Sequence, residues 1–196
     1  KESTDTTHFS LIDADGNIVS ATLTVNLPFG AAFAAPGTGV LLNNEMDDFS
    51  AKPGEPNAYG LIGFEANAIE PGKRMLSSMS PTIVQGPDRV AILGTPGGSR
   101  IITMVILGIL DFLEGNDPQS WVSLPRFHHQ YLPDEISAET DALTEEQIAA
   151  LEARGHTVTV RQRPWGNMHA VLWDLAAGEL SAAHDPRWES GKAEVR

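Results

Sequence analysis

An apolar run from Ile101 to Leu113, directly after a glycine-rich turn, constrains the fold of this chain most strongly. Its apolar positions are too dense for a helix with one face in water, so the run predicts a central helix packed against a sheet. The longest apolar stretch, Ile101 to Leu110, is too short to cross a bilayer. The run therefore predicts a buried core element of a globular domain, with no membrane span.

Short strand signals lie on both sides of this run. A hairpin is expected from His8 to Asn26, with its turn in the Asp-Gly-Asn sequence at residues 15–17. Further strands are expected at "SPTIV", "RVAIL", "HTVTVRQ", "MHAVLWD" and "GELSAAHD". Residues 28–60 contain many Gly, Pro and Asn residues and few periodic signals, so they predict a long ordered loop or lid.

Two more helices are expected after the apolar run. One lies around residues 119–124, and the other spans about 145–153, where Thr144 and Gln147 predict a capping box and Gly155 a C-terminal stop. The order of strands, loop, strands, helices and strands favours a layered α+β fold with an antiparallel sheet. No internal repeat or domain linker interrupts the chain, so one domain is expected.

The second arm of the hairpin has two chemically different faces, because successive strand residues point to opposite sides. The apolar face is formed by Val19, Ala21, Leu23 and Val25, and the polar face by Ser20, Thr22, Thr24 and Asn26. Such a polar face is ordinary if it meets solvent. It is unusual if both faces of the strand are covered.

The charge of the chain argues against two classes of partner. The sequence contains 26 Asp and Glu residues against 13 Lys and Arg residues, which gives a net charge of −13. No dense Lys/Arg block is present, so nothing favours binding to a nucleic-acid backbone or to an anionic membrane surface. The absence of cysteine excludes disulfides, thiolate metal sites and a cysteine nucleophile.

Several polar motifs could carry chemistry, and each also has a plain structural interpretation. "PGGSR" at 96–100 could turn free N–H groups toward an oxyanion or carboxylate, or could be a tight turn. "LSSMSPT" at 76–82 could donate hydroxyl hydrogen bonds to a ligand or to its own backbone. "NNEMDDF" at 43–49 gathers carboxylates and amides but lacks the central Gly of an EF-hand. Thr6, Thr7 and His8 could be a nucleophile with its neighbours or the polar end of an edge strand.

Taken together, the motifs resemble the small subunit of γ-glutamyltranspeptidase. The resemblance covers nearly the whole chain and is carried, in the family's order, by "TTHFSLIDADGNIVSATLTVN", "LLNNEMDDFSAKPGEPNAYGLIG", "PGKRMLSSMSPTIV", "GTPGGSRIIT", "PRFHHQYLPDE" and "AAHDPRW". It implies an N-terminal-nucleophile hydrolase with a four-layer αββα sandwich, completed by a separate large subunit. It also implies that a precursor cuts itself and that the new N-terminal threonine becomes the nucleophile.

The resemblance implies a cut between Asp5 and Thr6. Residues 1–5 are then expected to be a residual pre-cleavage segment, and residues 6–196 the catalytic small subunit, a single domain. The chain starts without Met or a signal peptide, which fits a piece of a longer product. A free α-amino group on Thr6 would titrate near neutral pH and could accept the hydroxyl proton.

The resemblance also implies a role for each candidate residue. Thr6 is the implied nucleophile, Thr24 its hydrogen-bond partner, and Gly97 with Gly98 the oxyanion hole. The implied substrate-binding residues are Asn26, Glu45 and Asp48 for the α-amino group of the donor, Ser77 and Ser78 for its α-carboxylate, and Tyr59 as part of a lid. Trp165 is expected to add an aromatic wall. No cofactor and no metal are implied.

The implied reaction is transfer or hydrolysis of γ-glutamyl groups, from glutathione and related donors to amino acids, peptides or water, in the periplasm or outside the cell. One alternative is a cephalosporin (glutaryl) acylase of the same family. Asn26, Glu45 and Asp48 argue against it, because a glutaryl group has no ammonium to pair with them. A second alternative, a non-catalytic binding subunit, is disfavoured by Thr6, Thr24 and the two glycines.

Overall fold

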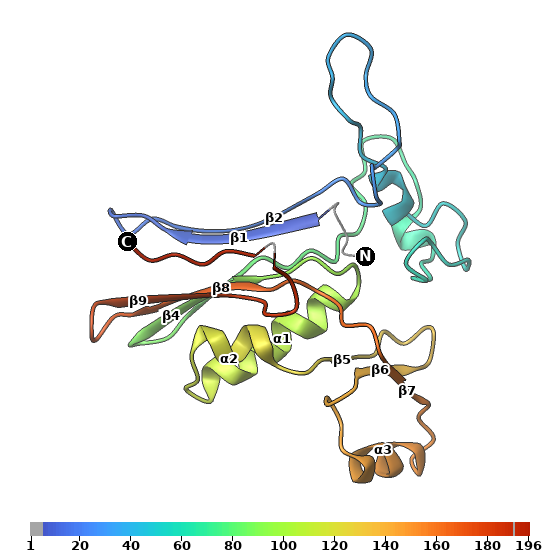
Figure 1. The fold of residues 1–196 in the computed structure, drawn as a ribbon. Helices are drawn as coiled ribbons and strands as arrows, with labels where there is room; N and C mark the ends of the chain where they lie inside the picture. Colours follow the sequence, from blue (N-terminus) through green and yellow to red (C-terminus); the bar gives the residue numbers. More distant parts are fainter. Residues whose placement is uncertain (1–5, 190) are drawn as a thin grey trace.

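The structure, a computed structural model, describes residues 6–189 and 191–196 (Figure 1). The expected pre-cleavage segment, residues 1–5, lies outside the described residues. The helices are α1 (Arg100–Leu113), α2 (Pro118–Ser123) and α3 (Glu145–Glu152), and two 3₁₀ turns are η1 (Glu45–Asp48) and η2 (Glu65–Asn67). The strands are β1 (Thr6–Ile12), β2 (Ile18–Thr24), β3 (Thr82–Gln85), β4 (Arg89–Gly94), β5 (Phe127–His128), β6 (Ile136–Glu139), β7 (Val158–Arg161), β8 (His169–Asp174) and β9 (Glu179–His184).

The sheet β3-β4-β8-β9 is the centre of the fold, and its neighbouring strands are all antiparallel. The β1–β2 hairpin covers one face of this sheet, while α1 and α2 lie on the other (Figure 1). The core between the sheet and the helices includes Leu93, Met104, Phe112, Trp121 and Met168. The layered α+β class expected from the sequence is therefore confirmed.

A second sheet, β5-β6-β7, lies beyond the helices, and the sequence-based expectation was incomplete there. β6 pairs antiparallel with β5 but parallel with β7, and neither β5 nor β6 was expected. The residues of β6 are all buried although they include Ser137 and Glu139. The four residues of β6 do alternate between apolar and polar, but the pattern is short and includes only one β-branched residue, so its strand signal is weak.

The expected helices are all present, with ends that differ by at most one residue from the predicted ones. α3 begins with the predicted capping box, in which Thr144 accepts from the Gln147 N–H and the Gln147 side chain accepts from the Thr144 N–H. Among the described residues α1 is covered on one side only, since its other face exposes Ile102, Ile106, Leu110 and Leu113. Among the helices of the described residues, none combines the length and apolarity needed to span a membrane.

The β1–β2 hairpin turns its polar face toward the central sheet. The hydroxyl of Ser20 donates to the carbonyl of Leu93 (3.3 Å), and that of Ser10 donates to the carbonyl of His169 (3.4 Å). The opposite face leaves Phe9, Leu11, Val19 and Leu23 exposed. The hairpin is therefore inverted relative to an ordinary amphipathic strand pair, and its apolar face has no cover within the described part of this chain.

The long loop expected at residues 28–60 is present and extends further, from the end of β2 to the start of β3. It is ordered by the two 3₁₀ turns and by isolated bridges that join Ala34 to Leu41, Ser50 to Ala68, and Pro56 to Ile62. In Figure 1 it rises beside the N-terminal end of β1. The loop therefore lies next to the threonine motif that opens the described chain.

His8 fills the space between the hairpin and the central sheet. It is 2% exposed, and its ring lies against Gly94 of β4. A Cβ atom at Gly94 would lie 2.3 to 2.8 Å from three atoms of this ring. The absence of a side chain at Gly94 is therefore what lets the hairpin approach the sheet.

We predict that Gly94→Ala lowers the free energy of unfolding by about 1–3 kcal/mol, because overpacking forces the His8 ring and β1 to shift. The matched control is Gly86→Ala, where the nearest atom to a new Cβ is the Arg89 carbonyl oxygen at 3.4 Å. Thermal and denaturant unfolding of both variants would measure the difference. Equal stability of the two variants would contradict the packing described above.

Candidate active site

The site begins with a pair of hydroxyl groups at the open end of the hairpin. The antiparallel register places Thr6 opposite Thr24, and their Oγ1 atoms are 2.8 Å apart. The backbone N–H of Asn26 donates to Thr24 Oγ1 at 2.8 Å. Since that bond occupies one lone pair of Thr24 and fixes its orientation, the hydroxyl remains able to donate to Thr6 or to accept from it.

Asn26 turns the chain out of β2 and connects it to the loop. Its φ of 72° lies in the left-handed region, which asparagine tolerates better than most residues. Its Nδ2 donates to the carbonyl of Asn44 at 3.2 Å, and the Asn44 side chain accepts from the N–H of Leu27 at 2.9 Å. These bonds hold the start of η1 against the end of β2.

Two carboxyl groups project from η1 toward the hydroxyl pair. Glu45 and Asp48 are three residues apart in a 3₁₀ turn, which places them on the same side. Burial raises the pKa of Glu45 to about 7, and both a hydrogen bond with Asp48 and the negative charge of Asp48 add to this shift. Burial also raises the pKa of Asp48. Glu45 Oε1 is buried without a hydrogen-bond partner among the described residues, so this pair suits a cationic donor.

A small cavity of about 40 Å³ joins these groups. The predicted site residues that line it are Thr6, Thr24, Asn26, Glu45, Asp48, Tyr59, Ser77, Ser78 and Gly98. Ser77 and Ser78 come from the segment before β3, and the hydroxyl of Ser77 accepts from the N–H of Met79 at 3.2 Å. The fold therefore brings all of the predicted site residues except Gly97 and Trp165 around one cavity.

Tyr59 and Gly98 close this cavity against each other. The hydroxyl of Tyr59 donates to the carbonyl of Asn26 at 2.9 Å, which fixes the aromatic ring. A Cβ at Gly98 would lie 2.9 Å from the ring, and the φ of this glycine is +60°. Both the space and the backbone angle therefore require glycine at this position.

Gly97 lies on the other side of the turn, in a much larger pocket of about 1160 Å³. Its φ is +148°, and α1 begins three residues later, at Arg100. Within residues 6–189 and 191–196, the backbone N–H groups of Gly97 and Gly98 donate no hydrogen bond. Unpaired N–H groups beside a hydroxyl are the arrangement that stabilises a developing oxyanion.

Thr6 lies where the two pockets meet, since Thr6, Tyr59 and Gly98 line both of them. Trp165, expected as an aromatic wall, is buried and lines the larger pocket. A molecule bound at Thr6 could therefore extend in two directions. One direction leads to the carboxyl pair and the other to the larger pocket.

His8 lies two residues after Thr6 on the same face of β1. Burial and the nearby His169 lower the pKa of His8 to about 4, so the imidazole is neutral at pH 7. Its ring nitrogens bond to Thr22 (2.8 Å) and Ser10 (3.0 Å). With both nitrogens occupied inside the layer interface, His8 supports the strand that carries Thr6.

Sequence reasoning did not single out every residue of the small cavity. The additional lining residues are Leu61, Met79, Ser99 and Ile101. All four lie within the motifs quoted above, but no role was assigned to them, and Leu61 and Ile101 are distinguished only by being apolar. Among the described residues, no group of three or more His, Asp or Glu side chains is arranged to hold a metal ion.

Comparison with known proteins agrees with this arrangement. The sequence profile of the γ-glutamyltranspeptidase family matches residues 1–195. The glutathione hydrolase proenzyme of Escherichia coli (strain K12) is 46% identical over 188 residues, which cover 95% of this chain and 32% of the relative.

Solved structures give the same result. A γ-glutamyltranspeptidase mutant of Helicobacter pylori aligns with a TM-score of 0.85 at 45% identity, covering 93% of this chain and 100% of that one. The enzyme of Pseudomonas nitroreducens complexed with L-DON aligns with a TM-score of 0.84 at 44% identity, covering 97% and 100%. The fold is that of the N-terminal-nucleophile hydrolases. The chain belongs to the γ-glutamyltranspeptidase family, and it spans about a third of the length of the curated relatives it matches.

We predict that Asp48→Asn lowers the pKa of Glu45 below its value of about 7, because the variant removes a neighbouring negative charge. The pKa should stay above the ordinary glutamate range, since burial is the largest cause of the shift. Infrared difference titration of the carboxyl band would measure it. Asp47→Asn, in the same turn but outside the cavity, should leave the titration of Glu45 nearly unchanged, and equal effects of the two variants would contradict the assignment.

Proposed function

We propose that this chain is the catalytic subunit of an enzyme that hydrolyses or transfers γ-glutamyl groups from glutathione and related donors. The observation that carries the proposal is the Thr6–Thr24 hydroxyl pair, 2.8 Å apart, facing a cavity with two carboxyl groups. A nucleophile beside a site for an ammonium group is what a γ-glutamyl donor requires, because its α-amino group lies near the reacting amide. The family membership supports the same reaction.

We propose that Thr6 is the nucleophile, after cleavage of the precursor between Asp5 and Thr6. Its Oγ1 attacks the γ-carbonyl carbon of the donor, an ester bond forms, and the amide C–N bond breaks. The free α-amino group of Thr6 takes the hydroxyl proton and passes it to the leaving amine. Water or an acceptor amine then attacks the ester, and its proton returns to Thr6 Oγ1 as the hydroxyl re-forms.

Gly97 and Gly98 are the proposed oxyanion hole. Their N–H groups make no other hydrogen bond in the described residues, so they are free to bind the negative charge that develops on the carbonyl oxygen. Donors held in place before the reaction are worth about 3–4 kcal/mol each in comparable sites. Thr24 is proposed to orient the Thr6 hydroxyl, because its own orientation is fixed by the N–H of Asn26.

Asn26, Glu45 and Asp48 are the proposed site for the α-amino group of the donor. Burial raises the pKa of Glu45, and the neighbouring Asp48 adds to the shift, so a negative charge on Glu45 is disfavoured unless a positive group pairs with it. An ammonium would replace the proton as the counter-charge, and it would give Glu45 Oε1 the partner it lacks in the described residues. Ser77 and Ser78 line the same cavity and are proposed to donate to the α-carboxylate.

The two carboxyl groups in the small cavity also argue against the hypothesis of a glutaryl acylase. A glutaryl group would leave both carboxyl groups facing an apolar methylene, which costs desolvation without compensation. The hypothesis of a non-catalytic binding subunit gives no reason for a hydroxyl pair beside two N–H groups that have no hydrogen-bond partner among the described residues. The proposed substrate is therefore a γ-glutamyl compound.

A second subunit from the same precursor is the proposed partner. Two apolar surfaces of this chain have no cover among the described residues: the outer face of the hairpin and the exposed face of α1. Apolar patches of this kind mark protein interfaces. The relatives named proenzyme are about three times as long as this chain, whereas the matched chains in the solved structures are about as long as it is. On the resemblance alone, we propose a periplasmic or secreted location.

For the full-length precursor, we predict that Thr6→Ala abolishes both cleavage and turnover, because one hydroxyl attacks in both reactions. Intact-mass spectrometry would detect a single uncut chain. Thr7→Ala is the matched control, since Thr7 lies on the opposite face of β1 and pairs with Leu23. Normal processing of the Thr6 variant would rule out its assignment as nucleophile.

A second prediction concerns the acyl group. Sites built to pair a polar group reject an analogue without it by up to about 10⁴-fold, and water entry or protonation of Glu45 reduces this ratio. We therefore expect kcat/KM for γ-glutamyl-p-nitroanilide to exceed that for glutaryl-p-nitroanilide by at least about 100-fold. Asp48→Asn should reduce the ratio by slowing the γ-glutamyl donor. Comparable rates in the unmodified enzyme would instead support the acylase.

A further inference from the structure

The larger pocket beside Thr6 is positively charged, in contrast to the chain as a whole. Its lining includes the arginines Arg100, Arg161 and Arg163 and a single carboxylate, Glu135. The chain carries a net charge of −13, so a surplus of guanidinium groups in one pocket is a local feature. Such a pocket favours an anionic ligand.

Arg100 is the first residue of α1, and its guanidinium lies over the ring of Trp165, with 4.8 Å between the guanidinium carbon and the ring centroid. Its side chain forms no ion pair with a carboxylate among the described residues. Burial and the charge of Arg161 both lower the pKa of Arg100. Arg100 and Arg161 line the same pocket, and the repulsion between their guanidinium groups is relieved when an anion binds between them.

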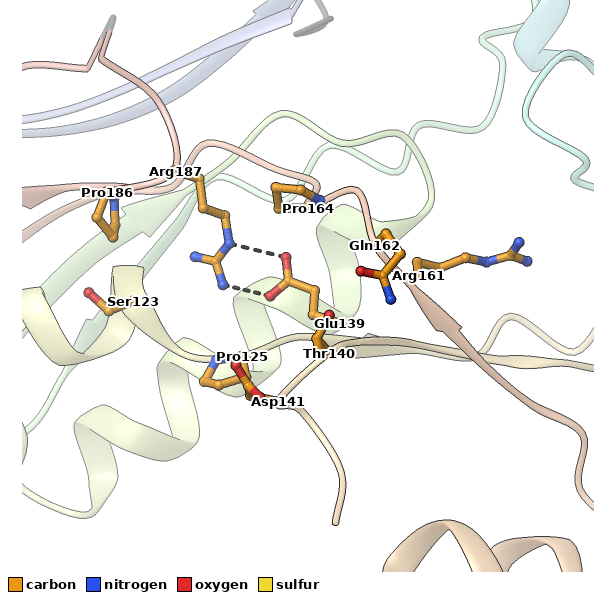
Figure 2. A pocket seen from close by; sticks show the side chains of 10 residues that line it. All are labelled: Ser123, Pro125, Glu139, Thr140, Asp141, Arg161, Gln162, Pro164, Pro186 and Arg187. Carbon is orange, nitrogen blue, oxygen red and sulfur yellow. Dashed lines mark hydrogen bonds and ion pairs between the residues drawn. The ribbon is translucent and has the colours of Figure 1, made fainter. Parts of the chain in front are cut away.

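Arg161, at the end of β7, forms an ion pair with Glu135. Glu135 is also hydrogen-bonded by Ser137, at 3.0 Å. Figure 2 shows the Arg161 side chain extending away from the neighbouring Glu139–Arg187 ion pair. Glu135 is therefore ion-paired with Arg161, and its charge also acts on Arg100, but one carboxylate against three arginines leaves the lining of the pocket with a net positive charge.

Trp165, on whose ring the Arg100 guanidinium stacks, is held in place by its neighbours. Trp165 is held by its backbone, because its carbonyl accepts from buried Arg126 and its N–H donates to Glu139 Oε1 at 3.4 Å. Glu139 in turn pairs with Arg187 at 2.6 Å, an ion pair drawn in Figure 2. An arginine stacked on a fixed ring loses less side-chain freedom when it binds a ligand.

We propose that Arg100 and Arg161 bind the free carboxylate of the peptide or amino acid that leaves Thr6 or attacks the acyl group on it. The proposal rests on the proposed function. It follows from the position of Thr6 between the two pockets: the γ-glutamyl group occupies the small cavity, so the other substituent of the scissile bond lies on the side of the larger pocket. The ligand class is a short peptide or amino acid with an unblocked C-terminus.

The test compares two acceptors that differ only in this carboxylate, glycylglycine and glycylglycinamide, with γ-glutamyl-p-nitroanilide as donor and the processed two-subunit enzyme. The rate of γ-glutamyl transfer to each acceptor is measured at equal concentrations of free amine. We expect the unmodified enzyme to prefer glycylglycine by at least about 10-fold in kcat/KM, the effect of one charged hydrogen bond or more. The ratio within each variant is the readout, so general losses of activity cancel.

Arg100→Ala and Arg161→Ala should each reduce this ratio toward 1. Arg161 is exposed, so its variant decides the outcome if Arg100→Ala fails to fold. Arg154→Ala, an exposed arginine outside the pocket, is the control and should keep the ratio of the unmodified enzyme. A ratio near 1 in the unmodified enzyme, or an unchanged ratio in both pocket variants, would overturn the proposal. Failure of the unmodified enzyme to release p-nitroaniline at all would instead contradict the proposed function, and the subsite with it.

Discussion

The pairing of β1 with β2 is the constraint on which the rest of the site depends. Its register places Thr6 opposite Thr24 and directs both hydroxyl groups to the face that also carries His8. A slip of one residue would turn Thr6 to the outer, apolar face. Part-buried hydrogen bonds from the hairpin to the central sheet support this register, and the missing side chain at Gly94 makes room for the His8 ring between the layers.

The site divides its charged side chains on either side of Thr6. Glu45 and Asp48 lie in the small cavity, and Arg100 with Arg161 lie in the larger pocket. A γ-glutamyl peptide has the complementary distribution, with an ammonium at the end of the acyl group and a carboxylate at the end of the leaving peptide. The same groups would therefore orient the scissile bond over Thr6 in one direction only.

Much of this arrangement could be predicted from local sequence, and the rest depends on tertiary contacts. The hairpin, α1 and the Thr144 capping box have signals within a few residues, and the site residues lay in long motifs that resemble a known family. β6 could not be predicted because its buried Glu139 is compensated by Arg187, distant in sequence. The inward polar face of the hairpin and the placement of Arg100 and Arg161 in one pocket likewise arise only when separate elements pack together.

The central claim is that Thr6 is the nucleophile between the two pockets, and covalent labelling tests it most directly. The probe is 6-diazo-5-oxo-L-norleucine, a diazoketone that keeps the α-amino and α-carboxyl groups of a γ-glutamyl donor, applied to the full-length processed protein. Peptide mapping by tandem mass spectrometry should find one adduct, on a peptide whose first residue is Thr6. An adduct on another side chain, such as Ser77, or the absence of any adduct in processed protein would contradict the account.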